Sequence, residues 1–253
     1  MNAEIRKYRK KIEVLMAVVL LVSVTIFAIK PRRFLSQRKV GVSEETTIKM
    51  ERETNGCCVV IDPGHGGKDP GKVGTKGTLE KEVNLKISFQ LKSILEEKGY
   101  MVRMTRSQDC HLGTERFRKT ADLNERCRMI NNCFEENIKT VMISIHQNSF
   151  EKPSVAGAQC FYYHKSQQGK ELAEAIQKRL NEKINTSGEK KEKSNDNYYM
   201  LINSQCPGII IECGFLSNPE EEEKLGAEDY QSFLSRVIAE GIEDYFRQKG
   251  HCS

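Results

Sequence analysis

Three features are missing from this 253-residue sequence: an internal repeat, a paired-cysteine metal motif and a basic domain. The nine cysteines include no CxxC pair and no zinc-ribbon spacing, so neither a zinc ribbon nor a disulfide framework is expected in a chain of this length. The net charge of +5 comes from residues 1–40, which alone carry +8 and leave −3 for residues 41–253. The domain therefore gives little reason to expect nucleic-acid binding.

Residues 14–29 contain no charged side chain, and basic clusters flank both ends. As a helix they would span about 24 Å, slightly less than a hydrocarbon core of about 30 Å. A buried core helix would have a polar face, and a cleaved signal peptide would end in a small-x-small site, which the following "FAIKPRRF" lacks. We expect residues 1–34 to form an uncleaved membrane anchor, with a cleaved signal peptide as the alternative, and residues 35–55 to be a polar linker.

From residue 56 onward, strand-like and helix-like segments alternate. Short apolar runs predict strands, and amphipathic stretches predict helices. The predicted strands are 57–62, 100–106, 140–146, 156–163 and 208–214, and the predicted helices are 81–98, 122–136, 168–184 and 219–247. Residues 186–197 are predicted to form a mobile polar loop. The alternation indicates a single α/β domain, residues 56–250, with a largely parallel sheet covered on both faces.

Three predicted strands end in a side chain that could bind a metal or transfer a proton. The first ends at His65, the third at His146 and the last at Glu212. Ligands bind beyond the carboxyl ends of parallel strands, so these side chains should converge, and two histidines with an acid suit a metal site. The glycine-rich turn at His65 does not fit a phosphate-binding loop, because Lys68 is followed by Asp69 rather than by serine or threonine.

A catalytic zinc site needs three protein ligands and one open position. His65 and His146 supply two of them, and an acid at the same crevice should supply the third. Glu80 also has a simpler explanation, because an acid in the first turn of a helix interacts favourably with the helix dipole. Spacing alone leaves four candidate acids open: Asp62, Asp69, Glu80 and Glu82.

The stretches "VVIDPGHGGKDPGKVG", "LEKEVNLKIS", "SIHQNS" and "IIIECGFLSNPEEEEKL" together resemble the zinc-dependent N-acetylmuramoyl-L-alanine amidases. The resemblance implies that Zn2+ is bound by His65, Glu80 and His146. It implies that Glu212 is the catalytic acid/base, which acts in hydrolysis of the amide bond between N-acetylmuramic acid and L-alanine in peptidoglycan. It also implies one α/β domain with a twisted, mostly parallel mixed sheet flanked by helices.

A short domain that follows a hydrophobic segment and lacks a cell-wall-binding repeat is most similar to the germination-specific (spore cortex) branch of that family. A peptidoglycan substrate places the domain outside the cytoplasmic membrane, in the cell wall or the forespore intermembrane space, tethered by residues 1–34. Gln147 departs from the family, in which a small residue is more common, and we expect it to narrow the site beside His146.

Two other functions are compatible with the same fold. One is a peptidoglycan-binding module without catalysis, which the presence of all four metal and catalytic positions disfavours. The other is a peptidase that cuts within the stem peptide. The sequence leaves open whether the chain forms a dimer or needs a protein partner.

Overall fold

The computed structural model describes residues 54–186 and 188–251. The predicted anchor, residues 1–34, lies outside this part of the chain, together with residues 35–53 of the predicted linker, so both stay predictions. The boundaries of the predicted domain, 56–250, likewise stay a prediction. Within the described residues, no helix combines the length and the apolar character that crossing a bilayer requires.

The described residues form a sheet of six strands in the order β2-β1-β3-β6-β4-β5. The strands are β1 (Cys58–Pro63), β2 (Met101–Met104), β3 (Thr140–Asn148), β4 (Gln159–Tyr163), β5 (Lys193–Asn195) and β6 (Gly208–Phe215). Neighbouring strands run parallel, except that β4 and β6 are antiparallel. The sheet is therefore mixed and mostly parallel, which confirms the predicted fold class.

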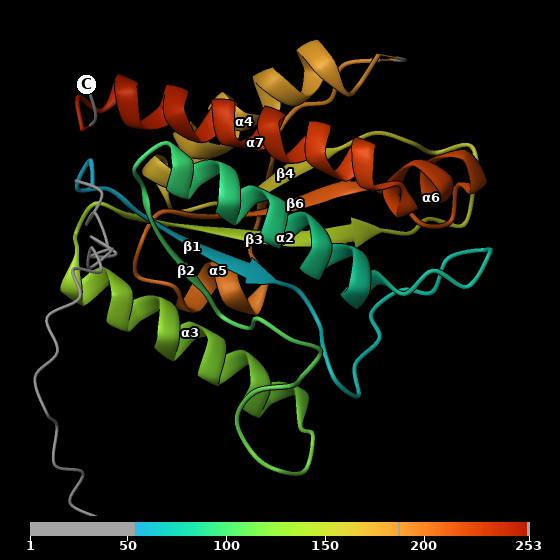
Figure 1. Cartoon of the computed structure of the whole chain (residues 1–253), viewed down its shortest axis with the longest axis horizontal. Coiled ribbons are helices and arrows are strands. Elements are labelled where there is room, and N and C mark those ends of the chain that lie inside the picture. Colours follow the sequence, from blue (N-terminus) through green and yellow to red (C-terminus); the bar gives the residue numbers. More distant parts are fainter. Residues whose placement is uncertain (1–53, 187, 252–253) are drawn as a thin grey trace, which may run out of the picture. The chain divides into compact units, whose positions relative to one another are not determined.

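Helices cover both faces of the sheet (Figure 1). On one face lie α2 (Glu80–Glu97), α4 (Gln167–Lys183) and α7 (Glu228–Gln248); on the other lie α3 (Lys119–Glu136) and the short α5 (Tyr199–Asn203); α6 (Pro219–Gly226) connects β6 to α7. Successive side chains of a strand point to opposite faces. Val59 and Ile61 of β1 therefore join the core under α2, α4 and α7, whereas Val60 packs in a second core with Ile130 of α3.

The structure departs from the sequence prediction in several places. Residues 193–195, within the predicted mobile loop 186–197, form β5, whose polar and mostly exposed residues show no apolar alternation. The predicted helix 219–247 is two helices, because the backbone of Ala227 is extended (φ −85°, ψ 130°). The sequence pattern also does not predict α5. His146 and Glu212 lie inside β3 and β6 rather than at strand ends, because both strands continue beyond them.

Helices α4 and α7 approach closely at Gly241. A Cβ on Gly241 would lie 2.6 Å from the Cα of Ile176, a backbone atom that cannot rotate away. Gly241→Ala should therefore push the helices apart and lower the free energy of unfolding by about 1–3 kcal/mol, despite the higher helix propensity of alanine. Urea unfolding of the full chain measures this. The control is Gly226→Ala at the end of α6, where a Cβ meets nothing within 4 Å; equal losses in both variants would contradict the packing explanation.

Candidate metal centre and active site

The turn that follows β1 places His65 beside the sheet. His65 has a positive φ of 62°, which is uncommon for a residue other than glycine and marks a backbone held by its surroundings. A residue with a Cβ would not fit at two neighbouring glycine positions. A Cβ on Gly64 would lie 2.3 Å from the His146 ring, and a Cβ on Gly71 would lie 2.5 Å from Glu80 Oε2. The glycine-rich turn thus allows three functional side chains to approach one another.

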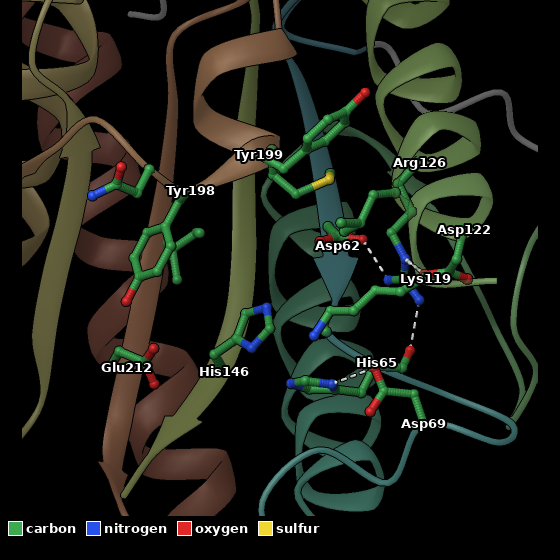
Figure 2. Close-up of a pocket in the computed structure, with 15 residues that line it drawn as sticks. Asp62, His65, Asp69, Lys119, Asp122, Arg126, His146, Tyr198, Tyr199 and Glu212 are labelled. Atoms are coloured by element: carbon green, nitrogen blue, oxygen red, sulfur yellow. Dashed lines mark hydrogen bonds and ion pairs between the residues drawn. The ribbon is translucent and has the colours of Figure 1, made fainter. Parts of the chain in front are cut away.

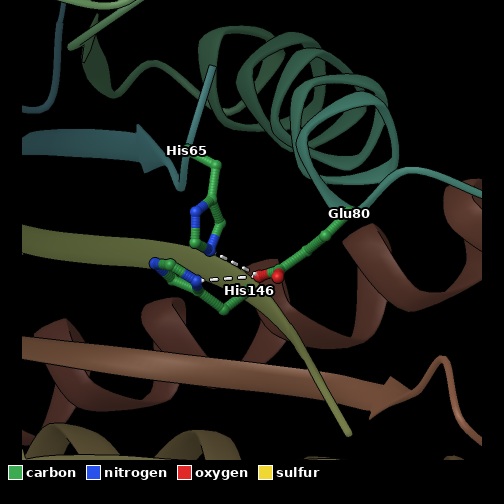
Figure 3. Close-up of side chains that lie close together, drawn as sticks. All are labelled: His65, Glu80 and His146. Atoms are coloured by element: carbon green, nitrogen blue, oxygen red, sulfur yellow. Dashed lines mark hydrogen bonds and ion pairs between the residues drawn. The ribbon is translucent and has the colours of Figure 1, made fainter. Parts of the chain in front are cut away.

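His65, Glu80 and His146 come together from the turn, the start of α2 and β3 (Figure 3). Glu80 Oε1 lies 3.1 Å from His65 Nε2 and 2.9 Å from His146 Nδ1, and one donor atom of each residue lies within 4.8 Å of the others. The ligands of a tetrahedral zinc, each about 2.0–2.1 Å from the ion, are about 3.3 Å apart. The two distances from Glu80 Oε1 are close to this value. The three residues supply two imidazole nitrogens and one carboxylate oxygen, the donor set of a catalytic zinc site with one open position.

Backbone amides hold the carboxylate of Glu80, whose side chain is buried. Oε2 accepts a hydrogen bond from the Lys72 amide (2.7 Å), and Oε1 accepts one from the Gln147 amide (3.1 Å). Burial opposes ionisation of Glu80, but hydrogen bonds with His146 and His65 outweigh it and hold the pKa of Glu80 far below its usual value. Glu80 is therefore ionised, which is the form in which a carboxylate can bind a metal.

The Gln147 side chain does not narrow the site, so that prediction is wrong. Because strand residues alternate between faces, Gln147 points away from the His146 side of the sheet. Its Nε2 donates a hydrogen bond to Oδ1 of Asn84 in α2 (3.1 Å), and Asn84 in turn donates to the Gly64 carbonyl (3.1 Å). Gln147 therefore supports the turn and Glu80 from the opposite face.

The other three candidate acids have different surroundings. Asp69 Oδ2 lies 2.9 Å from His65 Nδ1, the ring nitrogen that is not beside Glu80. Both carboxylate oxygens of the buried Asp62 accept hydrogen bonds from other side chains. Glu82 is exposed on α2. Of the four acids, Glu80 is the one that lies between the two histidines.

A cavity of about 350 Å³ opens on the face of the sheet that carries α3 and α5 (Figure 2). His65, His146, Glu212 and Tyr198 all line it. His146 and Glu212 are Cα partners on the parallel strands β3 and β6, so their side chains project from the same face. Burial raises the pKa of Glu212 to about 7, and its buried Oε2 has no hydrogen-bond partner within the described part of the chain. Such an acid can exchange a proton near neutral pH.

Comparison with known proteins identifies the family of this chain. A family model described as N-acetylmuramoyl-L-alanine amidase matches residues 59–244. The chain belongs to the N-acetylmuramoyl-L-alanine amidase family. The germination-specific N-acetylmuramoyl-L-alanine amidase of Bacillus subtilis is 39% identical over 201 residues, which cover 78% of this chain and 82% of that relative. The resemblance that the sequence motifs indicate is thereby confirmed.

Solved structures agree with this membership. The CwlD amidase from Clostridioides difficile, in complex with the GerS lipoprotein, superimposes with a TM-score of 0.70 at 33% identity over 76% of this chain and 99% of that chain. An N-acetylmuramoyl-L-alanine amidase from Clostridium difficile 630 gives a TM-score of 0.68 at 32% identity, over 78% of this chain and 100% of that chain.

In this family member, a buried arginine that the sequence analysis does not single out holds the turn (Figure 2). Arg126 of α3 pairs with Asp62 Oδ1 through Nη1 (2.8 Å) and with Asp122 Oδ2 through Nε (2.7 Å). The same guanidinium donates hydrogen bonds to the carbonyls of Pro63 (2.8 Å) and His65 (2.6 Å). The only hint in the sequence is a charged residue on the buried face of an amphipathic helix, at i+4 from an acid.

A second arginine binds the same turn. Arg106, which follows β2, donates from Nε to the Pro63 carbonyl (2.9 Å) and from Nη2 to the carbonyls of Gly64 (3.0 Å) and Lys81 (2.9 Å). Burial and the neighbouring charge of Arg126 lower the pKa of Arg106 to about 10, so it remains charged at neutral pH. Side chains from two distant segments thus fix the backbone that carries His65.

The stability contributed by Asp62 should depend on pH. Burial disfavours its charge, but Arg126 and neighbouring hydroxyl groups lower its pKa from 3.8 to about 2. The ionised form therefore stabilises the fold above pH 3.8, and this contribution is lost as the pH falls through about 2. We expect Asp62→Asn to lower the free energy of unfolding at pH 7 by at least about 2 kcal/mol.

The loss caused by Asp62→Asn should shrink by about 1 kcal/mol between pH 5 and pH 3. Urea unfolding of the full chain at a series of pH values measures it. Asp196→Asn, at an exposed position, is the control and should show no such trend. A loss that stays constant over this range would contradict the lowered pKa of Asp62.

Proposed function

We propose that this chain is a zinc-dependent amidase that hydrolyses the bond between the lactyl group of N-acetylmuramic acid and the L-alanine of the stem peptide in peptidoglycan. The observation that carries the proposal is the cavity in which His65 and His146 lie beside the unpartnered acid Glu212. Family membership supplies the bond that is cut. The names of relatives, including the germination-specific amidase, support the same substrate.

We assign the metal to His65, Glu80 and His146, whose two nitrogens and one oxygen suit zinc. When bound, zinc supplies Lewis-acid polarisation of the scissile carbonyl and of a water molecule. The buried negative charge of Glu80 balances part of the charge of a divalent ion. Asp69, close to His65 Nδ1, keeps that imidazole in the orientation that directs Nε2 toward Glu80.

Glu212 is proposed to transfer the protons of the reaction. In its ionised form it accepts a proton from the attacking water, and in its protonated form it delivers that proton to the leaving amine of L-alanine. A pKa of about 7 makes both forms accessible near neutral pH. The Tyr198 hydroxyl is directed toward Glu212 (Figure 2). Burial, followed by the charge of Glu212, raises the pKa of Tyr198, which keeps its phenol protonated as a hydrogen-bond donor in the cavity.

Lys119 is proposed to attract the stem peptide. Its side chain lines the cavity and extends from α3 toward its middle (Figure 2). Among the described residues, Lys119 makes no ion pair at the usual distance, whereas Arg126 in the same cavity already binds two acids and two carbonyls. Stem peptides carry free carboxylates, so a lysine beside the site gives the cavity a partner for them.

The proposed setting is outside the cytoplasmic membrane, where peptidoglycan lies, with residues 1–34 as the tether. The B. subtilis relative is named germination-specific, which favours a role in spore-cortex modification during germination. The C. difficile relative was solved in complex with a lipoprotein. We therefore include in the proposal a lipoprotein partner on the same side of the membrane.

The amidase activity is tested with the purified full chain, loaded with zinc, on spore-cortex peptidoglycan. Mass spectrometry should find intact stem peptides with a free L-alanine amino terminus. A chelator should abolish their release, and added zinc should restore it. Peptides that begin at any other residue would identify a stem-peptide peptidase, and binding without any product would identify a binding module.

Glu212→Gln should lower kcat by about 10²–10⁴-fold, because the proton acceptor is lost while the shape of the side chain is kept. Zinc stoichiometry, measured by elemental analysis, should stay the same as in the wild type, since Glu212 is not among the three clustered ligands. Glu135→Gln, an exposed acid on α3, is the matched control and should keep full activity. Unchanged turnover by Glu212→Gln would contradict the role proposed for this residue.

Lys119→Glu should raise KM for soluble muropeptides roughly fivefold, the size expected for an exposed charge contact, with little change in kcat. Lys178→Glu makes the same charge reversal on α4, on the opposite face of the sheet, and should leave KM unchanged. Amidated stem peptides, which lack the carboxylates, should be cleaved equally by Lys119→Glu and the wild type. A KM effect that persists with amidated substrate would contradict carboxylate recognition.

A further inference from the structure

The chain between Lys72 and Glu80 forms a short loop whose two ends are hydrogen-bonded to each other. The Glu80 amide donates to the Lys72 carbonyl (2.9 Å), and the Lys72 amide donates to Glu80 Oε2 (2.7 Å). Val73 and Leu79 form a bridge beside them. The position of the Lys72 amide therefore decides which carboxylate oxygen of Glu80 is occupied, and it leaves Oε1 facing the two histidine rings.

The tip of this loop is attached to α6 through one buried carboxylate. Glu222 is 1% exposed. It accepts hydrogen bonds from Thr75 Oγ1 (2.5 Å), from the Lys76 amide (2.9 Å) and from the Thr78 amide (3.2 Å). Burial raises the pKa of Glu222, but these hydrogen bonds outweigh it and lower the pKa to about 2. The charged carboxylate of Glu222 thus accepts hydrogen bonds from three donors of a loop that lies 144–147 positions earlier in the sequence.

The loop and the helix fit each other at this carboxylate. A Cβ on Gly74 would lie 2.2 Å from Glu222 Oε1, so the loop has no side chain where the carboxylate enters. The start of α6 is fixed by Asn218, whose Oδ1 accepts hydrogen bonds from the amides of Glu220 (3.0 Å) and Glu221 (3.1 Å). Glu222 therefore extends from a helix with a fixed position. It is not a member of the histidine–glutamate cluster itself.

We propose that Glu222 is a positioning residue for the metal centre. By holding the tip of the loop, it keeps the Lys72 amide on Glu80 Oε2 and so orients the carboxylate of Glu80 toward His65 and His146. The inference rests on the proposed function, because it requires Glu80 to bind the metal. Removing an outer partner of a metal ligand typically weakens metal binding by about 10–100-fold. Because Glu222 acts through the loop, we expect the lower end of this range, about tenfold.

The experiment compares zinc binding by two variants of the full chain. Glu222→Gln keeps the shape of the side chain but removes its charge. Glu223→Gln is the matched control, because Glu223 is the next residue of α6 and pairs with Lys76 Nζ of the same loop (2.8 Å) while 76% exposed. Zinc affinity is measured by competition with a chelator, at a temperature at which circular dichroism shows each metal-free variant to be folded. We expect about tenfold weaker binding for Glu222→Gln alone.

Equal zinc affinity of the two folded variants would overturn the inference and leave the proposed function intact. A wild-type chain that binds no zinc would overturn the proposed function, and the inference would fall with it. A lower unfolding temperature of metal-free Glu222→Gln with unchanged zinc affinity would show a purely structural role, and so would also overturn the inference. If Glu222→Gln does not fold, Thr75→Ala removes one donor to Glu222 and should weaken zinc binding about threefold; unchanged affinity in Thr75→Ala would then overturn the inference.

Discussion

The buried charge pair between Asp62 and Arg126 is the interaction on which the active face depends. An unpaired ion in this position would cost several kcal/mol, and the pair itself contributes less net stability than its distances suggest. The main effect of the pair is to fix the position of the turn, because the guanidinium that neutralises Asp62 also donates to the carbonyls on either side of Gly64. The positive φ of His65 persists because those carbonyls are held, and the strain at one residue is balanced by hydrogen bonds from another element.

Two glutamates of the site experience opposite environments within a small volume. Glu80 is buried but surrounded by amide and imidazole donors, so its charge is stabilised and its pKa is lowered. Glu212 is buried without a partner for Oε2, so its charge is destabilised and its pKa is raised. The same residue type therefore suits a permanent negative ligand in one position and a proton carrier in the other, and hydrogen-bond donors make the difference.

Much of this structure could be predicted from the sequence, and the remainder has physical reasons. Alternating apolar strands and amphipathic helices predict the largely parallel sheet covered on both faces, since burial drives both patterns. The resemblance to the amidase family adds the mixed character of the sheet and points to His65, Glu80, His146 and Glu212. The polar strand β5 carries no apolar signal and forms only because β4 offers it a partner. The contacts of Arg126 with Asp62 and of Glu222 with Thr75 join residues more than 60 positions apart, so no local pattern could reveal these two contacts.

Finally, the Cα pairing of His146 with Glu212 has a consequence for how proteins with this fold can vary. The separation of the two residues is one strand spacing, about 4.8 Å, which the hydrogen bonds of the sheet set and loops do not alter. A substitution or insertion in the surrounding loops can therefore reshape the cavity for another substrate without changing the distance between histidine and acid. Only a shift of register between β3 and β6 would change this distance. A one-residue shift would point one of the two side chains into the core on the opposite face of the sheet.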